Sequence, residues 1–257
     1  MKPTLLFLMI FATAAASWAN GETNVPFRVG EKLTYQIYWG PFIGGKATLE
    51  VAGIEKIASN DCYHLIAEAY TTGLVDMLYH VKSRTESWLD VDELCTRRYR
   101  QERTEGKRFR SDDSLYDYSN KHLVTTNYVT GKPHTYALDA PVQDMISCLY
   151  YVRSRPLQLD VTEQFPVVLG STRYDVTVKP DERKTLFFRP TGNVQALRIE
   201  PNPTIAVVSA NKGRMWFWVS DDPRKLLLLI TSDMKIGSAK FVLTQVEPAT
   251  TKSGDKR

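Results

Sequence analysis

Larger apolar and polar side chains alternate along most of the chain, which is the pattern of a strand with one buried and one solvated face. The first two such runs cover residues 33–39 and 46–51, and Gly44 and Gly45 lie in the turn between them. Consecutive strands without intervening helices predict a mainly all-β fold, either a strongly curved antiparallel sheet or a barrel-like meander. The further runs, separated by turn residues, cover residues 63–69, 77–89, 97–101, 109–117, 122–128, 174–178, 186–188, 196–199, 215–219, 226–231 and 239–246.

One segment follows a helical period instead. Between residues 142 and 153 the apolar positions recur at intervals of three and four, with Pro141 before the segment and Pro156 after it. Proline is tolerated in the first turn of a helix and cannot continue one, so both prolines fit the ends of a helix. The pattern predicts one central helix between two β-rich halves.

The N-terminus has the three parts of a secretory signal peptide. Lys2 supplies a positive charge, an apolar run follows over residues 5–16, and Ser17 and Ala19 are the small residues of a cleavage site. The apolar run is shorter than the roughly 20 residues that span a bilayer, and no later stretch approaches that length. We therefore predict a signal peptide over residues 1–19, cleaved near Ala19, and a periplasmic or secreted protein without a transmembrane segment.

Composition fits a folded domain after the signal peptide. Of 257 residues, 43% are hydrophobic and 24% are charged, which excludes a collagen-like, low-complexity or generally disordered chain. No sharp change of composition marks a linker, so we expect a single β-rich domain over residues 20–249. The polar residues 250–257 are expected to form a disordered tail.

The net charge is small, with 33 Lys and Arg against 29 Asp and Glu, and it gives no indication of nucleic-acid binding. Basic residues are nevertheless concentrated between Lys82 and Arg110, where nine Lys or Arg stand against six Asp or Glu. Cross-strand ion pairs on solvated strand faces are the favoured interpretation, and an anion-binding surface is the alternative.

Three cysteines, Cys62, Cys95 and Cys148, lie outside any Cys-x-x-Cys pattern, and no histidine stands at metal-ligand spacing. We therefore expect neither a metal nor a cofactor. In an oxidising compartment one disulfide can form, and Cys62 with Cys95 is the preferred pair because both lie near the same end of consecutive predicted strands. Buried free thiols are the alternative, since connectivity cannot be read from spacing.

No catalytic motif of a known type is present, and no catalytic residue is assigned. Arg84 and Glu86 share one strand face, and Asp144 and Ser147 stand at the start of the predicted helix. These residues can form a polar site, but structural roles are favoured. Such roles are a same-face ion pair for the first two residues and a favourable helix N-terminal charge for Asp144.

Aromatic residues on the predicted strands indicate a binding site more strongly. A closed or half-closed antiparallel sheet either fills its interior with such side chains or lines a ligand cavity with them. Plain core packing is the favoured interpretation of these side chains, and a ligand cavity is the alternative. The candidate ligand-binding residues are Tyr35, Trp39, Arg84, Glu86, Trp88, Asp144, Trp216 and Trp218.

Four segments also carry a family resemblance. They are residues 26–35 (PFRVGEKLTY), 84–90 (RTESWLD), 143–153 (QDMISCLYYVR) and 213–222 (GRMWFWVSDD). In their order and spacing they resemble the bacterial exported family called domain of unknown function 3108, over about residues 26–246. The resemblance implies an exported, single-domain, largely antiparallel β protein with a strongly curved sheet or barrel. It implies no reaction.

These observations favour a non-catalytic periplasmic module that binds an apolar or glycan-like envelope molecule, that is, a lipid or a glycan. An outer-membrane-associated structural or envelope-assembly protein, with an envelope partner, is the alternative. Charges on both faces of several middle strands weigh against it, because they are costly when they face lipid. The second alternative is an enzyme with an unrecognised site around Asp144, Arg84 and Glu86.

Overall fold

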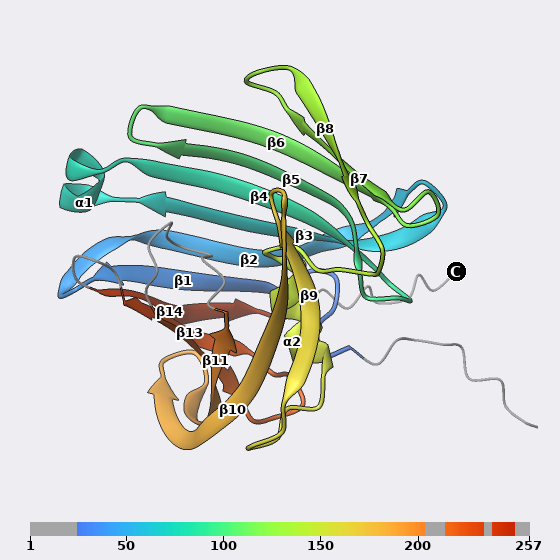
Figure 1. Cartoon of the computed structure of the whole chain (residues 1–257). Coiled ribbons are helices and arrows are strands. Elements are labelled where there is room, and N and C mark those ends of the chain that lie inside the picture. Colours follow the sequence, from blue (N-terminus) through green and yellow to red (C-terminus); the bar gives the residue numbers. More distant parts are fainter. Residues whose placement is uncertain (1–24, 204–213, 234–237, 250–257) are drawn as a thin grey trace, which may run out of the picture.

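The computed structural model describes residues 25–203, 214–233 and 238–249. The predicted signal peptide and C-terminal tail lie outside these residues. The described chain forms one sheet of fourteen strands, each antiparallel to its neighbours, in the order β8-β7-β6-β5-β4-β3-β2-β1-β14-β13-β12-β11-β10-β9 (Figure 1). The predicted mainly all-β, strongly curved antiparallel fold is confirmed.

Nearly all neighbouring strands are also consecutive in sequence, and the pairing of β1 with β14 joins the two halves. The first half contains β1 (Lys32–Trp39), β2 (Phe42–Ile57), β3 (Asn60–Thr71), β4 (Val81–Asp90), β5 (Thr96–Glu105), β6 (Arg108–Asp117), β7 (His122–Asn127) and β8 (Lys132–Ala137). The second half contains β9 (Glu163–Leu169), β10 (Thr172–Phe188), β11 (Gly192–Asn202), β12 (Met215–Ser220), β13 (Leu227–Asp233) and β14 (Ser238–Glu247).

The sheet curves strongly enough to enclose an interior (Figure 1). Its ladders contain register shifts, for example between Thr34 and Tyr35 on β1 and between Val51 and Gly53 on β2. Bulges of this kind bend a strand and increase its twist, so they help the long strands to follow the curve. Apolar side chains from both halves fill the enclosed space.

A short extended segment links the two outer parts of the sheet. The carbonyl oxygen of Val142 accepts a hydrogen bond from the backbone N–H of Thr96, at the start of β5 (3.0 Å). The N–H of Gln143 donates to the carbonyl of Pro166 (2.9 Å), and the carbonyl of Gln143 accepts from the N–H of Val168 (2.8 Å), both on β9. Because it bonds to β5 on one side and β9 on the other, this segment closes one end of the sheet into a barrel-like form.

The central helix, α2 (Ser147–Ser154), lies inside the curve of the sheet (Figure 1). It begins at Ser147 and not at residue 142, where the sequence pattern places its start. The difference has a physical cause, because residues 142–143 pair with strands on both sides and are therefore extended. The prediction of a central helix is correct, but its first turn is replaced by a strand-like connection.

A second short helix, α1 (Gly73–Leu78), lies between β3 and β4, where the sequence pattern predicts a strand over residues 77–89. That prediction is wrong at its start, since β4 begins only at Val81. None of the residues of α1 is buried, so no helical stripe of apolar positions marks it in the sequence. The backbone of Gly73 has φ of 60°, which favours glycine and allows the turn into the helix.

The preferred disulfide is not formed, since all three cysteines are free and buried. Cys62 pairs with Asp90 on β4, and the N–H of Asp90 donates to the carbonyl of Cys95. Strand β4 therefore separates the two cysteines by about two strand spacings, roughly 10 Å, which exceeds the limit of about 7 Å for bridged Cα atoms. Burial raises the pKa of Cys62 to about 12 and that of Cys95 to about 11, so both are protonated at neutral pH.

Candidate functional site

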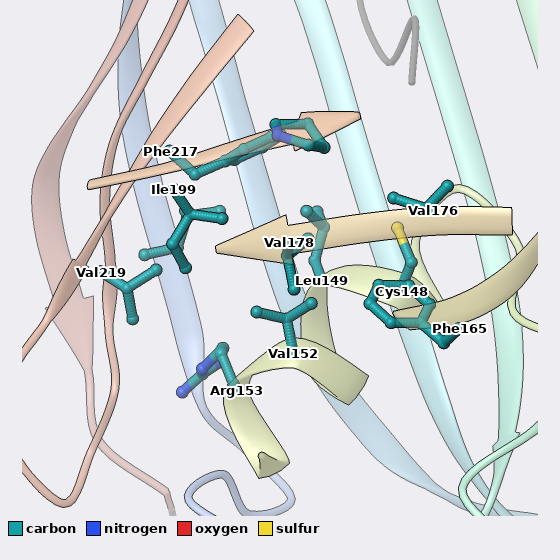
Figure 2. Close-up of a pocket in the computed structure, with 12 residues that line it drawn as sticks. Cys148, Leu149, Val152, Arg153, Phe165, Val176, Val178, Ile199, Phe217 and Val219 are labelled. Carbon is teal, nitrogen blue, oxygen red and sulfur yellow. The ribbon is translucent and has the colours of Figure 1, made fainter. Parts of the chain in front are cut away.

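An apolar cavity of about 40 Å³ lies between α2 and the strands of the second half of the sheet (Figure 2). Cys148, Leu149, Val152 and Arg153 line it from α2, with side chains that point away from the helix axis toward the strands. The strands supply the opposite wall with Phe165, Val176, Val178, Ile199, Pro201, Phe217, Val219 and Leu227. The cavity is therefore built where one face of the helix meets a curved apolar sheet face.

The strand walls follow from simple alternation. On β12 the side chains of Met215, Phe217 and Val219 are buried and face inward, while Trp216 and Trp218 are only half-buried on the other face. Phe217 and Val219 line the cavity, and neither tryptophan does. The structure thus places the two candidate tryptophans on the sheet face opposite the cavity. Phe217, which lies between them in sequence, lines the cavity.

One end of the cavity carries a buried cation, Arg153. Its two terminal nitrogens donate to both carboxylate oxygens of Glu31 (2.7 and 3.0 Å), and one of them also donates to the carbonyl of Arg224 (3.2 Å). Burial acts to lower the pKa of Arg153, but the charge of Glu31 and its hydrogen bonds hold it above the usual value. This ion pair joins α2 to the segment just before β1.

Two buried polar atoms near this end have no hydrogen-bond partner in the described part of the chain. They are Nε of Arg153 and the hydroxyl oxygen of Tyr150, one helical turn apart on α2. The Arg153 guanidinium also lies 5.4 Å from the centre of the Tyr150 ring. Buried polar groups are nearly always satisfied, so a water molecule or a polar group of a ligand is expected beside them.

The candidate Tyr35 is fully buried in the same core cluster as the cavity walls. Its hydroxyl donates to the carbonyl of Leu227 (2.8 Å), which lines the cavity, and burial raises the pKa of the hydroxyl well above its usual range. Tyr35 therefore supports one wall from behind. Trp39 ends β1, where it pairs with Phe42 and Ala239, and it is not among the cavity residues.

Asp144 is the centre of a second buried cluster, outside the cavity. Its Oδ1 accepts hydrogen bonds from the N–H groups of Ile146 (2.6 Å) and Ser147 (2.9 Å), so it caps the start of α2. Its Oδ2 accepts from the hydroxyls of Ser87 (2.5 Å) and Thr96 (2.9 Å) on the neighbouring strands. Burial raises the pKa of Asp144, and the four donors partly oppose that rise.

Arg84 and Glu86 do not join Asp144. On β4, Ser87 faces inward to Asp144, so Glu86 and Arg84 stand on the opposite face of the strand. The three residues proposed for an enzyme site are thus separated by the sheet itself. The structure gives this grouping no common pocket, and the enzyme alternative loses the residues on which it rested.

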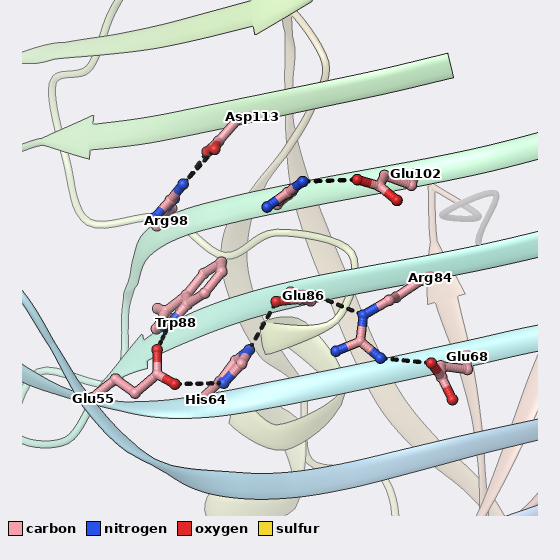
Figure 3. A network of polar contacts seen from close by, with 10 residues as sticks. Glu55, His64, Glu68, Arg84, Glu86, Trp88, Arg98, Glu102 and Asp113 are labelled. Carbon is pink, nitrogen blue, oxygen red and sulfur yellow. Dashed lines mark hydrogen bonds and ion pairs between the residues drawn. The ribbon is translucent and has the colours of Figure 1, made fainter. Parts of the chain in front are cut away.

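On the outer face, Arg84 and Glu86 belong to a network of polar contacts (Figure 3). Arg84 donates to Glu68 and Glu86 (both 2.6 Å), and the His64 ring nitrogens lie 3.0 Å from oxygens of Glu86 and Glu55. Although burial acts to raise the pKa of Glu86, the hydrogen bonds and charges of its two partners lower it below its usual value. The network is an arrangement of mutually satisfied charges.

Trp88 completes this outer surface. Its ring stacks on His64 at 4.7 Å, and its indole N–H donates to Glu55 (2.8 Å). The guanidinium of Arg98 lies 5.0 Å from the Trp88 ring centre. Trp88 is therefore only 5% exposed on a solvated face, because neighbouring side chains already contact its ring and its N–H. Within the described residues, no group of three or more His, Cys, Asp or Glu is arranged to hold a metal ion.

Sequence reasoning missed most of the cavity residues, among them Phe165, Val176, Val178 and Phe217. The available signal was the alternation on β12, which assigns Phe217 to one face and the tryptophans to the other. Choosing the buried face required knowledge of what covers it, and α2 covers it from more than 60 positions away in sequence. The candidate residues are large aromatic or charged side chains, whereas the cavity is lined mainly by medium-sized aliphatic side chains.

The fold and its interior define a class of protein: an antiparallel, barrel-like β protein with a helix packed inside the curve. The chain belongs to the family described as protein of unknown function (DUF3108), whose family model matches residues 34–244. The family predicted from the sequence motifs is confirmed. No curated protein matches the chain.

Solved structures of other proteins are similar to this fold. The beta-barrel-like protein of domain of unknown function DUF1849 from Brucella abortus aligns with 87% of this chain and 99% of its own, at 13% identity and a TM-score of 0.55. A Bacteroides fragilis protein, described as exported and YmcC-like in fold, covers 87% of this chain and 98% of its own at 13% identity and a TM-score of 0.33. A Parabacteroides distasonis protein, described as a lipoprotein, has the same coverage at 8% identity and a TM-score of 0.32.

Proposed function

We propose that this protein is a non-catalytic module of the periplasm that binds an apolar envelope molecule, such as a fatty acyl chain, in the cavity under α2. The observation that carries the proposal is the apolar cavity itself, bounded by one helix and five strands. Protein interiors are close-packed and an empty cavity lowers stability, so a cavity kept inside the main core is best explained by an occupant.

The chemistry of the lining favours an acyl chain over a glycan. A sugar ring needs several hydrogen-bond donors and acceptors, whereas the walls here are aliphatic and aromatic side chains with Arg153 at one end. The unpartnered Nε of Arg153 is a donor that fits the carboxylate or ester oxygen of an acyl ligand. Apolar contacts would hold the chain, and this donor would fix its direction.

The volume sets how the ligand enters. A cavity of about 40 Å³ accommodates a short apolar group, so a longer chain requires α2 to separate from β10 and β12. Helix α2 is connected to the sheet on its N-terminal side by the extended segment at residues 142–143 and on its other side by the loop before β9. We propose that α2 moves on these two connections when the ligand binds.

The proposed compartment rests on the predicted signal peptide over residues 1–19. Within the described residues, neither helix has the length and apolar character needed to cross a bilayer. Export would bring the mature chain to the envelope, where acyl chains are abundant.

Native mass spectrometry tests the proposal. The mature chain, starting at residue 20, is purified without detergent from an exporting host and measured before and after organic extraction. We expect a stoichiometric lipid-sized mass that extraction removes and added palmitate restores. Val178→Phe fills the cavity and is expected to lower palmitate occupancy at least about tenfold, because the larger side chain takes the ligand's volume.

The matched control is Val161→Phe, which makes the same change at an exposed valine outside the cavity and should bind palmitate as the unmodified chain does. An apo mass before extraction, together with no binding of palmitate, would show that the cavity is a packing defect. Equal loss of binding in both variants would place the ligand elsewhere.

A further inference from the structure

We infer that one end of the sheet, the α1 rim, docks on the surface of an anionic phospholipid bilayer. The α1 rim is defined by six exposed apolar residues, Phe42, Ile43, Leu74, Met77, Leu78 and Phe109, and by five exposed basic residues, Lys46, Lys82, Lys107, Arg108 and Arg110. This inference concerns a surface apart from the cavity and does not depend on the proposed function.

Three connections bring these residues to the same end. The turn between β1 and β2, the α1 segment between β3 and β4, and the turn between β5 and β6 all lie where paired strands end together. The N–H of Thr72 donates to the carbonyl of Gly44 (3.0 Å), and the N–H of Gly106 donates to the carbonyl of His80 (2.7 Å). Backbone hydrogen bonds thus join the three connections into one edge, at the left of Figure 1.

The apolar residues of the α1 rim point into solvent. They are between 55% and 83% exposed, and Met77 and Leu78 on α1 are the most exposed of the six. Helix α1 buries none of its residues, and the hydrogen bond from the Thr71 hydroxyl to Asp76 (2.5 Å) holds it at the end of β3. Single exposed apolar side chains are ordinary, but a contiguous group of them indicates a surface that contacts another phase or partner.

Basic and aromatic side chains alternate next to this edge. Register pairs place Lys46 beside Tyr70, Tyr70 beside Lys82, Lys82 beside Thr104, and Thr104 beside Phe109 on neighbouring strands. Directly opposed residues share one face of a sheet and lie about 5 Å apart. The row runs across five strands and presents cations and aromatic rings on one outer face.

The basic residues of the α1 rim outnumber the acidic residues beside them, which are Asp76 on α1 and Glu105 opposite Arg108. In the middle of β4 and β5, Arg84 pairs with Glu68 and Arg98 with Asp113, which confirms the cross-strand ion pairs expected from the sequence. Arg100 pairs with Glu102 on its own strand. The five basic residues of the α1 rim form no ion pair with any residue that the structure describes. The basic cluster noted between residues 82 and 110 therefore contains both kinds of residue, paired in the middle and unpaired at the end.

This combination fits a lipid surface better than a protein. Apolar side chains on short turns can enter the boundary of headgroups and acyl chains, while Lys and Arg beside them meet anionic headgroups. A protein partner would need acidic and apolar groups that match a ridge of three separate turns. A bilayer needs no such match, because it adapts to the shape of the ridge.

Vesicle flotation tests the inference. The mature chain, extracted to remove bound lipid, is mixed with vesicles of phosphatidylcholine alone or of phosphatidylcholine and phosphatidylglycerol at three to one. We expect binding to the anionic vesicles at least about tenfold tighter than to the neutral ones, and weaker as salt rises.

Two variants separate the apolar contribution to vesicle binding from the electrostatic one. Met77→Asp with Leu78→Asp should weaken binding to anionic vesicles at least about tenfold, because the inserted side chains are lost. Lys82→Glu with Lys107→Glu and Arg108→Glu should remove the preference for anionic vesicles. All the changed residues are exposed, and an unchanged thermal unfolding curve shows that each variant is folded.

Matched controls lie on the hairpin between β10 and β11, at the other end of the strands. Phe187→Asp changes an apolar residue that is 71% exposed, and Lys184→Glu with Arg189→Glu reverses two exposed charges. Both controls should bind vesicles as the unmodified chain does. The cavity variant Val178→Phe should also bind vesicles normally, so failure of ligand binding and failure of docking are distinguishable.

Two results would overturn the inference. One is equal or absent binding to the two kinds of vesicle. The other is a dimer in solution that Met77→Asp with Leu78→Asp dissociates while vesicle binding is unchanged, since the α1 rim would then be an interface between two copies of this chain.

Discussion

Asp144 shows what one buried carboxylate does in this protein. It accepts two backbone N–H groups at the start of α2 and two hydroxyls from β4 and β5, and it is 1% exposed. Its own N–H donates to hydroxyls of Thr96 and Ser147. Asp144 therefore fixes the residue at which the extended segment becomes a helix. Through its bonds to β4 and β5 it also fixes the position of the start of α2 relative to these strands.

Replacing Asp144 should therefore be costly. Asp144→Ala leaves two buried N–H groups and two hydroxyls without their acceptor, and we expect the free energy of unfolding to fall by about 3 kcal/mol or more. Asp144→Asn keeps one acceptor oxygen for the two N–H groups and should cost roughly half as much. Urea denaturation followed by tryptophan fluorescence measures both changes.

The surface pair of Asp139 with Arg173 supplies the control. Asp139 is exposed, so Asp139→Ala should change the free energy of unfolding by less than about 1 kcal/mol. If Asp144→Ala were as mild as this control, the account of the buried cluster would be wrong.

For single residues, the sequence predicts which side chains share a strand face better than it predicts the residues that they contact. The alternation on β4 correctly places Arg84 and Glu86 on one face, and the expected pair between them is present. The same pattern cannot tell which face is inward, because both faces of β4 carry polar residues, with Thr85 and Ser87 buried and Glu86 half-buried. The pattern therefore allows Asp144 to be grouped with Arg84 and Glu86, although the sheet lies between them.

Among the elements, strands β2 and β3 approach each other closely at the end that lies near the α1 rim. Gly45 pairs with Thr71, and a Cβ atom on Gly45 would lie 2.2 Å from the backbone carbonyl oxygen of Tyr70. Backbone atoms cannot yield as the end of a flexible side chain can. Glycine is thus required here by the space between strands.

Gly45→Ala should accordingly destabilise the protein by about 2 kcal/mol, because β2 and β3 must separate locally. Gly53→Ala on the same strand is the matched control, since nothing lies within 4 Å of its Cβ position and its φ is not positive. We expect the control to be neutral or slightly stabilising, as less backbone freedom is lost on folding. Thermal unfolding of the two variants measures the difference, and equal melting temperatures would contradict the packing described here.

The two helices differ in how far the sequence predicts them. Helix α2 has one buried face, so apolar residues recur at helical spacing, and only its start is displaced by the strand-like pairing of Gln143. Helix α1 is six residues long and buries nothing, so neither a stripe of apolar residues nor a cap marks it. A helix can be predicted from its apolar positions only when one of its faces is buried, because burial is what makes apolar residues recur at helical spacing.

For the whole molecule, the strands and turns are local features, and the sequence predicts most of them. It does not predict β8 and β9, it divides β10 into two runs, and it places Gly44 and Gly45 in a turn although they lie within β2. Closure depends on contacts between distant segments, such as β1 with β14 and residues 142–143 with β5 and β9, which no local pattern encodes. The cavity exists only after this closure, because its walls come from α2 and from strands on both sides of β11. For that reason the curved fold could be predicted and the site could not.

The most direct test of the central claim, that an apolar ligand occupies the cavity under α2, is a methyl NMR titration of the extracted mature chain with palmitate. The account predicts shifts of the methyl groups of Val152, Val176 and Val178, while those of Val51 and Leu65 in the other core cluster stay in place. Shifts confined to Leu74 and Leu78 on α1, or no shifts at all, would contradict it.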